Sequence, residues 1–546
     1  MPAIETNVHE KTIPSVLLHA KESWPDRPAI KYKNEIVTYE ELFNRVGRLT
    51  KGFENIGIKK GDHVAILISG YPEWFYISYA LSTLGAVIVP INITWKSQEI
   101  LHVLRYSDVK VLITMDTFRD VDYIALFKEL IPELENATAG FLESKLLPQL
   151  EMVISISEEG HSYAGCFSYE DILHASIKYD QEKLEHLIDH VMPDDTSFIL
   201  FTSGSTAFPK PVLRSHGSNI GIAHYISPDL KQEDSYLHYL PFYHIAGCVY
   251  IALGSVLKGA CIVLMESFHP TEALRLIEAE KITHMGGFDT HFQMLTNHSA
   301  FHKTDLSSIK RMLLAGGPEW YTKLKEIGFK HSVIAHHYGF TEGTGVIMPL
   351  DETDEMLKKL SNGKPFPGVE VKVVDSNSGE TLPANVPGEI CLKGWTLFQG
   401  YYKMPKETAE VMDEEGFFHT GDYGWLDEDG YVYYRGRYKN MIKTGGENVS
   451  EREVEMFLES HDDIKVVQVI GIPDTKWGEA VTAVVETHTG DELTLEAMKI
   501  FCAKNISNTK IPKHVFNITK EAWPITPTGK FNKKVLREMV MEDLEK

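Results

Sequence analysis

The segment at residues 201–216 reads FTSGSTAFPKPVLRSH and follows the apolar run SFILF. A run of that length with β-branched and aromatic residues predicts a buried strand, so the hydroxyl-rich segment is expected to be the loop at its end. Four hydroxyl donors and a positive charge lie in this loop, at Thr202, Ser203, Ser205, Thr206 and Lys210. Such a loop is suited to wrapping a polyphosphate with side-chain and backbone donors.

The loop differs from the P-loop of nucleoside triphosphatases, although its spacing is close to that motif. Counted from Gly204, the lysine of Gly-x4-Gly-Lys-Ser/Thr falls at Lys210. Pro209 replaces the second glycine, and Pro211 replaces the hydroxyl residue that would bind magnesium. Because proline has no N–H, it removes a donor that such a phosphate nest needs. A Ser/Thr-rich segment after a strand is also often a simple turn with no ligand. The loop alone therefore leaves open whether it binds phosphate or only reverses the chain.

The first part of the chain alternates between helical and strand patterns. Apolar residues recur at helical spacing in residues 38–58, 73–86 and 97–108. Short apolar runs of strand length stand at residues 62–68, 87–92, 110–114, 196–202, 259–265, 282–288, 311–317 and 331–339. This alternation predicts parallel sheets with helices on their faces. Residues 118–165, which contain Pro132 and Pro148, predict a surface excursion between the two series of units.

The pattern changes after about residue 365. Short β-rich runs at residues 369–375, 388–394 and 430–437 alternate with turn-rich stretches, which predicts antiparallel hairpins. A small α+β pattern follows, in which Ser450 and Glu453 predict a capping box at the start of a helix. The predicted fold class is therefore α/β, with a large N-terminal domain at residues 1–437 that includes a small β-barrel-like part. A small α+β domain at residues 438–546 completes the chain.

Composition excludes some functions. The chain has 546 residues, too many for one hydrophobic core, and a formal net charge of −23. That charge argues against binding nucleic acid or an anionic membrane, because phosphate contacts need clustered Lys and Arg. Five scattered cysteines without C-x-x-C spacing argue against a disulfide framework or a zinc site. Since neither a signal pattern nor a clean run of about 18 apolar residues is visible, no membrane span is expected and the cytoplasm is predicted.

Four further segments concentrate polar residues: YGFTEGTG at 338–345, HTGDYGW at 419–425, RGRYKNMIKTGGENVSEREVE at 435–455 and PITPTGKFNKK at 524–534. Together with TSGSTAFPK they resemble, in order and spacing, the motifs of the adenylate-forming (AMP-binding) superfamily. That superfamily contains acyl- and aryl-CoA synthetases, luciferases and peptide-synthetase adenylation domains. The resemblance covers nearly the whole chain. Residues 125–156 further resemble the acyl-CoA synthetase branch, especially medium-chain fatty-acyl enzymes, although this second similarity is weaker.

The resemblance implies two half-reactions. The carboxylate of an acid first attacks the α-phosphate of ATP, and a thiol, expected to be that of coenzyme A, then displaces AMP. It also implies that the small domain is mobile and rotates about Lys439 between the steps. Rotation would withdraw Lys530 and bring Lys443, Gly445 and Gly446 to coenzyme A. The expected cofactors are ATP, Mg²⁺ and coenzyme A.

The resemblance also implies a role for each motif residue. Lys530 would bridge the acid and the α-phosphate, Asp422 would accept the ribose hydroxyls, and Glu342 would bind Mg²⁺. Lys530, Thr341 and His244 are the expected catalytic residues, with His244 acting as a gate near the acyl pocket. The expected ATP-binding residues are Thr202, Ser203, Gly204, Ser205, Thr206, Lys210, Gly316, Gly317, Pro318, Tyr338, Gly339, Thr341, Glu342, Asp422, Arg437 and Lys530. Among them, Tyr338 would stack on adenine.

The sequence departs from the family pattern at four positions. Ala207 and Pro211 stand where most relatives have glycine, His337 where they have a small residue, and Asp289 where they often have proline. A fatty or other hydrophobic acid is the first expectation, but these changes leave its identity open. A stand-alone adenylation enzyme that loads a carrier protein is one alternative. A catalytically impaired nucleotide-binding regulatory relative is another, and monomer and homodimer both stay open.

Overall fold

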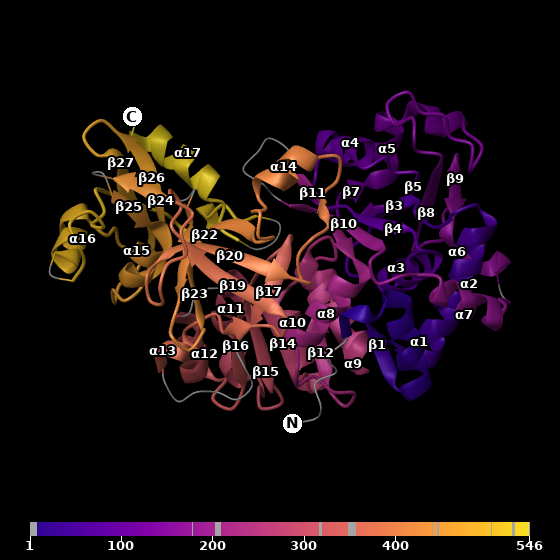
Figure 1. Cartoon of the computed structure of the whole chain (residues 1–546), viewed down its shortest axis with the longest axis horizontal. Helices are drawn as coiled ribbons and strands as arrows, with labels where there is room; N and C mark the ends of the chain where they lie inside the picture. The colour runs from indigo at the N-terminus through magenta and orange to yellow at the C-terminus, as the bar shows by residue number, and fades with distance from the viewer. Residues whose placement is uncertain are drawn as a thin grey trace.

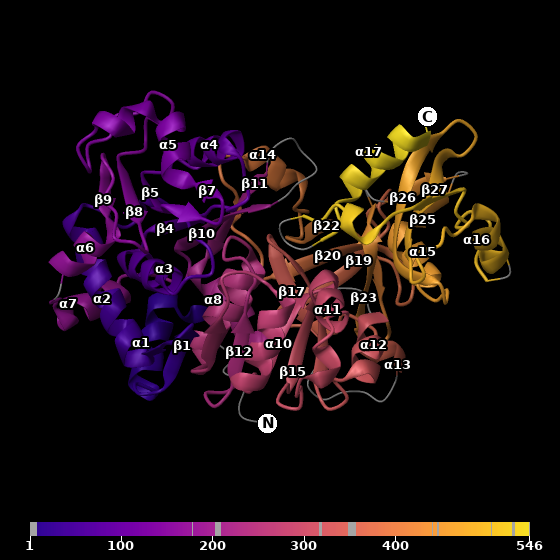
Figure 2. The same cartoon turned by 180° about the vertical axis from the view of Figure 1, so that it is seen from behind.

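The computed structural model describes residues 8–176, 178–202, 209–315, 319–347, 356–438, 441–444, 447–503, 505–526 and 530–544. Within these ranges the chain forms two large sheets, a four-stranded sheet and a separate C-terminal sheet. Figure 1 shows the two large sheets side by side, with the C-terminal sheet and its helices to one side of them; Figure 2 shows the same arrangement from behind. The predicted α/β fold class is confirmed.

One large sheet carries the hydroxyl-rich segment at its edge. It runs in the order β21-β11-β10-β4-β3-β5-β8-β9. Its strands are β3 (His63–Leu67), β4 (Val87–Pro90), β5 (Val111–Met115), β8 (Met152–Ile156), β9 (Cys166–Ser168), β10 (Thr196–Thr202), β11 (Lys210–Ser215) and β21 (Gly400–Tyr401). The strands from β10 to β9 are parallel, whereas β11 and β21 are antiparallel to their neighbours. Because Thr202 pairs with Lys210, the lysine begins a strand and lies opposite the start of the loop.

The second large sheet runs in the order β18-β17-β16-β15-β14-β12-β13-β1-β2. Its strands are β1 (Pro28–Tyr32), β2 (Glu35–Thr38), β12 (Ser235–His238), β13 (Cys261–Leu264), β14 (His284–Phe288), β15 (Arg311–Ala315), β16 (Val333–Phe340), β17 (Gly343–Ile347) and β18 (Lys364–Pro365). The strands from β16 to β1 are parallel. Their carboxyl ends therefore meet at one edge, where open α/β sheets usually bind ligands.

Helices fill the space between the two sheets. They are α1 (Ile13–Ser23), α2 (Tyr39–Asn55), α3 (Glu73–Leu84), α8 (His216–Ile226), the π-helical segment Ala246–Leu253 and α9 (Gly254–Lys258). Residues 74–84 of α3 are all buried, which fits a helix that is apolar all round. Thr38 begins α2 as its N-cap and forms a full capping box with Glu41.

The large part contains nine further α-helices within the described residues. They are α4 (Ser97–Tyr106), α5 (Tyr123–Leu130), α6 (Tyr169–Ala175), α7 (Gln181–Asp189), α10 (Pro270–Ala279), α11 (Asp289–Thr296), α12 (Glu319–Ile327), α13 (Met356–Lys359) and α14 (Pro405–Glu410). Of these, α6 and α7 pack against α2 and α3. The predicted surface excursion at residues 118–165 is wrong. This stretch contains α5 and β8, and its Phe127, Leu134 and Val153 are fully buried against the first sheet.

A four-stranded antiparallel sheet follows, made of β19 (Val369–Val374), β20 (Gly388–Gly394), β22 (Phe418–Leu426) and β23 (Val432–Arg437). The C-terminal sheet contains β24 (Met441–Thr444), β25 (Glu447–Ser450), β26 (Ile464–Asp474), β27 (Gly478–Thr487) and β28 (His514–Asn517). Helices α15 (Glu451–Leu458), α16 (Leu495–Cys502) and α17 (Lys533–Leu544) pack on it and enclose two hydrophobic clusters of their own. The proposed domain boundary at residues 437–440 falls between β23 and β24.

Ser450 caps α15 by accepting from the Glu453 N–H, as predicted, but the Glu453 carboxylate bonds Lys510 rather than closing the box. Within the part of the chain that the structure describes, no helix combines the length and apolar character that crossing a bilayer requires.

Candidate active site

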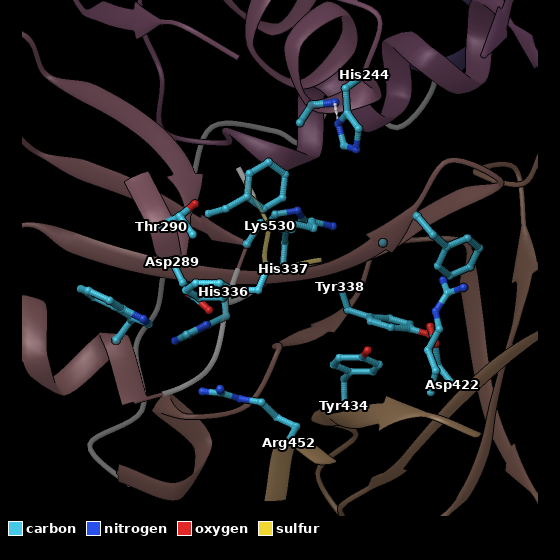
Figure 3. A pocket seen from close by; sticks show the side chains of 18 of the residues that line it. His244, Asp289, Thr290, His336, His337, Tyr338, Asp422, Tyr434, Arg452 and Lys530 are labelled. Carbon is cyan, nitrogen blue, oxygen red and sulfur yellow. Dashed lines mark hydrogen bonds and ion pairs between the residues drawn. The ribbon is translucent and has the colours of Figure 1, made fainter. Parts of the chain in front are cut away.

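A cleft of about 1610 Å³ lies at the carboxyl edge of the second sheet and reaches the C-terminal part of the chain. The ends of β10, β14, β15 and β16 contribute to its lining, as do Arg452 of α15 and Lys530. Figure 3 shows Lys530 and Arg452 entering the same space as residues of the large part. Ten of the predicted site residues line this cleft: Thr202, Lys210, His244, Tyr338, Gly339, Thr341, Glu342, Asp422, Arg437 and Lys530.

The other predicted residues are placed differently. Ser203, Gly204, Ser205, Thr206, Gly316, Gly317, Pro318, Lys439, Gly445 and Gly446 lie outside the described residues, as does Ala207. Lys443 stands on β24, where its backbone N–H donates to Glu479 Oε2 at 2.8 Å, and it does not line the cleft.

A buried carboxylate at one side of the cleft is held by two partners. Tyr338 donates its hydroxyl hydrogen to Asp422 Oδ2 at 2.7 Å, and Arg437 Nε lies 3.0 Å from Oδ1. Asp422 and Arg437 are direct cross-strand partners on β22 and β23, which explains their contact. Asp422 is 3% exposed, and burial raises the pKa of Tyr338, so its phenol keeps its proton. Gly421, at φ 68°, supplies the left-handed turn before this carboxylate.

A second carboxylate, Glu342, is positioned by residues that the sequence did not single out. Tyr401 donates its hydroxyl to Glu342 Oε1 at 2.8 Å, and Lys210 Nζ lies 4.7 Å from the Tyr401 ring centroid. Arg214 donates from Nη1 to the backbone oxygens of Glu342 and Thr396 at 3.2 and 2.8 Å. Burial lowers the pKa of Arg214 to about 10, which still leaves it charged at neutral pH.

Lys530 approaches the cleft from the C-terminal part. Its Nζ lies 4.8 Å from the Phe288 ring centroid, and its backbone N–H donates to Thr526 Oγ1 at 3.0 Å. Solvent reaches the side chain through the cleft, yet the protein atoms around the ammonium lower its pKa by desolvation. The positive charge of Arg437 lowers this pKa further, whereas Asp289 opposes the shift.

Two neutral histidines stand near Lys530 (Figure 3). Burial lowers the pKa of His244 to about 3 and that of His337 to about 4, so both rings are uncharged at neutral pH. His244 accepts from the Ala246 N–H at Nδ1 and meets the Phe288 ring edge-on at 5.9 Å. The His337 ring meets Tyr250 edge-on at 5.5 Å. The rings of Phe288, His244, His337 and Tyr250 therefore form an aromatic, uncharged patch on this wall of the cleft.

Asp289, the first residue of α11, lines the cleft opposite Arg452 of the C-terminal part (Figure 3). The pKa of Arg452 is raised: burial works against the shift, but the carboxylates of Glu459, Glu455 and Asp289 outweigh it. Asp289 also acts on Lys530. The negative charge of Asp289 therefore acts on two cations of the C-terminal part of the chain, and also on Lys323 of α12 in the large part.

Comparison with known proteins is consistent with this geometry. The family model described as AMP-binding enzyme matches residues 17–402, and that of the AMP-binding enzyme C-terminal domain matches residues 453–530. YngI of Bacillus subtilis, provisionally named an acyl-CoA synthetase, is 33% identical over 97% of both chains. The mitochondrial medium-chain acyl-CoA ligase ACSF2 of Macaca fascicularis is 30% identical over 98% of this chain and 88% of its own.

Solved structures show the same fold. ATP-bound MatB from Rhodopseudomonas palustris superimposes with a TM-score of 0.79 at 23% identity, over 96% of this chain and 98% of its own. The fatty acyl CoA synthetase of Mycobacterium tuberculosis gives a TM-score of 0.69 at 26% identity, over 98% and 99% of the two chains.

Proposed function

Because the chain belongs to the AMP-binding, adenylate-forming enzyme family, we propose that it is an ATP-dependent ligase that joins a carboxylic acid to coenzyme A. A carboxylate oxygen of the acid attacks the α-phosphorus of ATP, and pyrophosphate leaves with the electron pair of the broken P–O bond. The thiol sulfur of coenzyme A then attacks the acyl carbon, AMP departs, and the thiol proton passes to solvent. The proposal rests on one observation: Lys530, Glu342 and Asp422 all line the same cleft.

The described residues fit the charges that develop in the first step. Lys530 supplies a positive charge that can contact the incoming carboxylate and the α-phosphate together, which offsets their repulsion. Asp422 offers carboxylate oxygens to the ribose hydroxyls, with Tyr338 and Arg437 fixing its orientation. Lys210, across the hairpin from Thr202, supplies positive charge for the outer phosphates.

Glu342 fits a magnesium ligand. Its carboxylate lines the cleft, and the Tyr401 hydroxyl occupies Oε1, so Oε2 can face a hard cation that prefers oxygen. When bound, Mg²⁺ would neutralise phosphate charge. Arg214 donates to the backbone oxygen of Glu342. Both the backbone and the carboxylate of Glu342 are therefore held by hydrogen bonds.

The acid is proposed to be fatty or otherwise hydrophobic. Phe288, His244 and His337 give the wall near Lys530 an aromatic, uncharged character. The name of the ACSF2 relatives, medium-chain acyl-CoA ligase, is in keeping with this choice. The five cysteines are all free thiols, which supports a reducing compartment such as the cytoplasm.

The test is a pyrophosphate-release screen over a panel of acids that vary in chain length and polarity. One preferred class of acid, with product formation that depends on free coenzyme A, is the expected result. Transfer only to the phosphopantetheine thiol of a carrier protein would instead identify a stand-alone adenylation enzyme. ATP binding without pyrophosphate release from any acid would identify a nucleotide-binding regulatory relative.

Replacing Asp289 tests what its charge does in the cleft. Asp289→Asn should slow adenylate formation, most strongly at alkaline pH, because it removes a negative charge that favours the protonated form of Lys530. Asp289 raises the pKa of Lys530 against desolvation and Arg437, so its loss lowers that pKa further. Lys530 then loses its proton at a lower pH. The alkaline limb of the pH–rate profile should therefore move to lower pH.

Glu326→Gln is the matched control, since Glu326 is an exposed carboxylate on the wall of the same cleft. It should leave the pH profile unchanged. If Asp289→Asn left the profile in place but shifted the preference from cationic to neutral acids, Asp289 would contact the acid rather than the C-terminal cations.

A further inference from the structure

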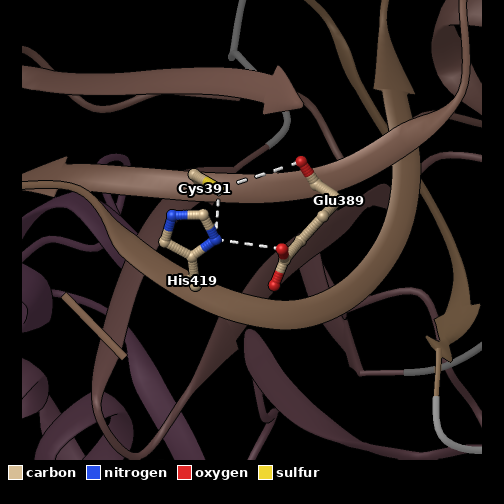
Figure 4. Close-up of side chains that lie close together, drawn as sticks. All are labelled: Glu389, Cys391 and His419. Atoms are coloured by element: carbon tan, nitrogen blue, oxygen red, sulfur yellow. Dashed lines mark hydrogen bonds and ion pairs between the residues drawn. The ribbon is translucent and has the colours of Figure 1, made fainter. Parts of the chain in front are cut away.

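A second cluster of ligand-type side chains lies on the four-stranded sheet, beside the cleft. Cys391 on β20 is paired directly with His419 on β22, and Glu389 stands two residues before Cys391, on the same face of the strand. The ligand atoms of these three residues all lie within 4.8 Å of one another. Figure 4 shows the thiol, the imidazole and the carboxylate converging on one point.

The separations suit a small tetrahedral ion. Cys391 Sγ lies 3.6 Å from His419 Nδ1, and Glu389 Oε2 lies 2.9 Å from the same nitrogen. Zinc bonds of about 2.3 Å to sulfur and about 2.0–2.1 Å to nitrogen place those two atoms roughly 3.5 Å apart at a tetrahedral angle. The thiol and imidazole already have that spacing, and the carboxylate oxygen would have to move about 0.5 Å further from the imidazole nitrogen.

The other atoms of the imidazole and the carboxylate are held as in a metal site. His419 Nε2 faces Asp413 Oδ2 at 3.7 Å, and the Phe417 N–H and Lys372 Nζ fix that carboxylate at 2.8 and 2.9 Å. A carboxylate on the far nitrogen of a ligating histidine is the usual supporting contact in zinc sites. The other ring nitrogen, Nδ1, faces Cys391 and Glu389.

Glu389 is oriented in the same way. Its Oε1 accepts from the Gly421 N–H at 2.8 Å, which leaves Oε2 directed at the cluster. A metal ion placed among these atoms could bind the thiolate, the imidazole and the carboxylate together.

We propose that Glu389, Cys391 and His419 form a binding site for one thiophilic divalent cation of the zinc type. Sulfur and imidazole ligands favour zinc over magnesium, which prefers oxygen. His419 also lines the cleft and its side chain is 31% exposed, so the ion has a path of access and water can fill a fourth position. Binding converts the thiol to a Zn–S bond and releases its proton to solvent.

The site would tie β20 to β22 close to the cleft. Asp422 follows His419 by three residues, and Gly421, between them, is already bonded to Glu389. A bound ion would therefore fix the backbone that presents Asp422. This role in positioning Asp422 rests on the proposed function, whereas the binding of the metal does not.

The test is a titration of the metal-free, untagged full-length protein with Co²⁺, a spectroscopic substitute for zinc. The expected result is one bound equivalent, with the intense near-ultraviolet band of a cobalt–thiolate bond, displaced by one equivalent of Zn²⁺. Weak d–d absorption without that band, or no saturable binding at all, would overturn the proposal. Both readouts are independent of catalysis, so they stand even if the proposed ligase activity is not found.

Variants identify the ligands. Cys391→Ser should abolish the thiolate band, and His419→Gln should weaken cobalt binding at least tenfold. Asp413→Asn, which removes only the supporting contact, should weaken it about 10- to 100-fold while keeping the band. Cys166→Ser, in a half-buried thiol on β9 of the first sheet, is the matched control and should bind like the wild type. An unchanged band in Cys391→Ser would place the metal elsewhere.

Discussion

Lys530→Ala should slow acid-dependent ATP–pyrophosphate exchange about a hundred- to a thousandfold, which corresponds to the loss of one contact worth about 3–4 kcal/mol in the transition state. We expect this loss because of where Lys530 lies. It enters the cleft from the C-terminal part of the chain and lies against the Phe288 ring. From this position its ammonium group is expected to contact the acid and the α-phosphate together.

The second half-reaction separates this role from a general loss of structure. Thioester formation from supplied acyl-adenylate and coenzyme A should be nearly unchanged, because no negative charges have to be brought together by Lys530 in that step. Lys534→Ala, an exposed lysine on α17, is the control and should leave both half-reactions intact. Equal damage to both half-reactions by Lys530→Ala would exclude a role confined to adenylation.

Asp422→Ala should raise the KM for ATP at least about a hundredfold. Hydrogen bonds to a charged group contribute about 1.5–3 kcal/mol each, and this carboxylate is expected to accept two from the ribose. The change also leaves Arg437 without the carboxylate that lies 3.0 Å from its Nε. Steady-state kinetics at saturating acid and coenzyme A measure the effect, and calorimetric titration with ATP checks it in the absence of turnover.

Asp422→Asn is the matched variant, because it keeps the shape and one acceptor oxygen. It should fall between the wild type and Asp422→Ala. Far-UV circular dichroism would confirm that both variants are folded. An unchanged KM in both would show that the ribose is held elsewhere and that Asp422 serves only Tyr338 and Arg437.

The sequence was sufficient for most elements of the large sheets, because those strands are apolar runs flanked by amphipathic helices. It was wrong at residues 118–165, where Pro132 and Pro148 suggested a surface excursion. Pro132 in fact begins a short 3₁₀ turn after α5, and β8 joins the sheet as a parallel strand. The burial of such a stretch depends on neighbours far along the chain, which local patterns do not report.

Within the candidate site, motif residues could be found from their order, but the residues that support them could not. Tyr401 and Arg214 lie 59 and 128 positions from Glu342 and reach it only through β11 and β21. The proposed cation site on β20 and β22 could not be inferred from the sequence for a similar reason, since the spacing of the cysteines argued against zinc. Cys391 and His419 are 28 positions apart, and only the pairing of β20 with β22 brings them together.

The C-terminal sheet encloses its own hydrophobic clusters, separate from those of the large part. Heat should therefore unfold the chain in two calorimetric steps when no ligand is present, since each unit has the core needed for its own cooperative transition. A nucleotide that contacts both Asp422 and Lys530 is released when either unit unfolds, so it opposes the first unfolding step by about 2.7 kcal/mol at a hundredfold excess over its Kd. Saturation with ATP should then bring the two melting steps together, and the distance between them becomes a measure of how firmly the ligand couples the two units.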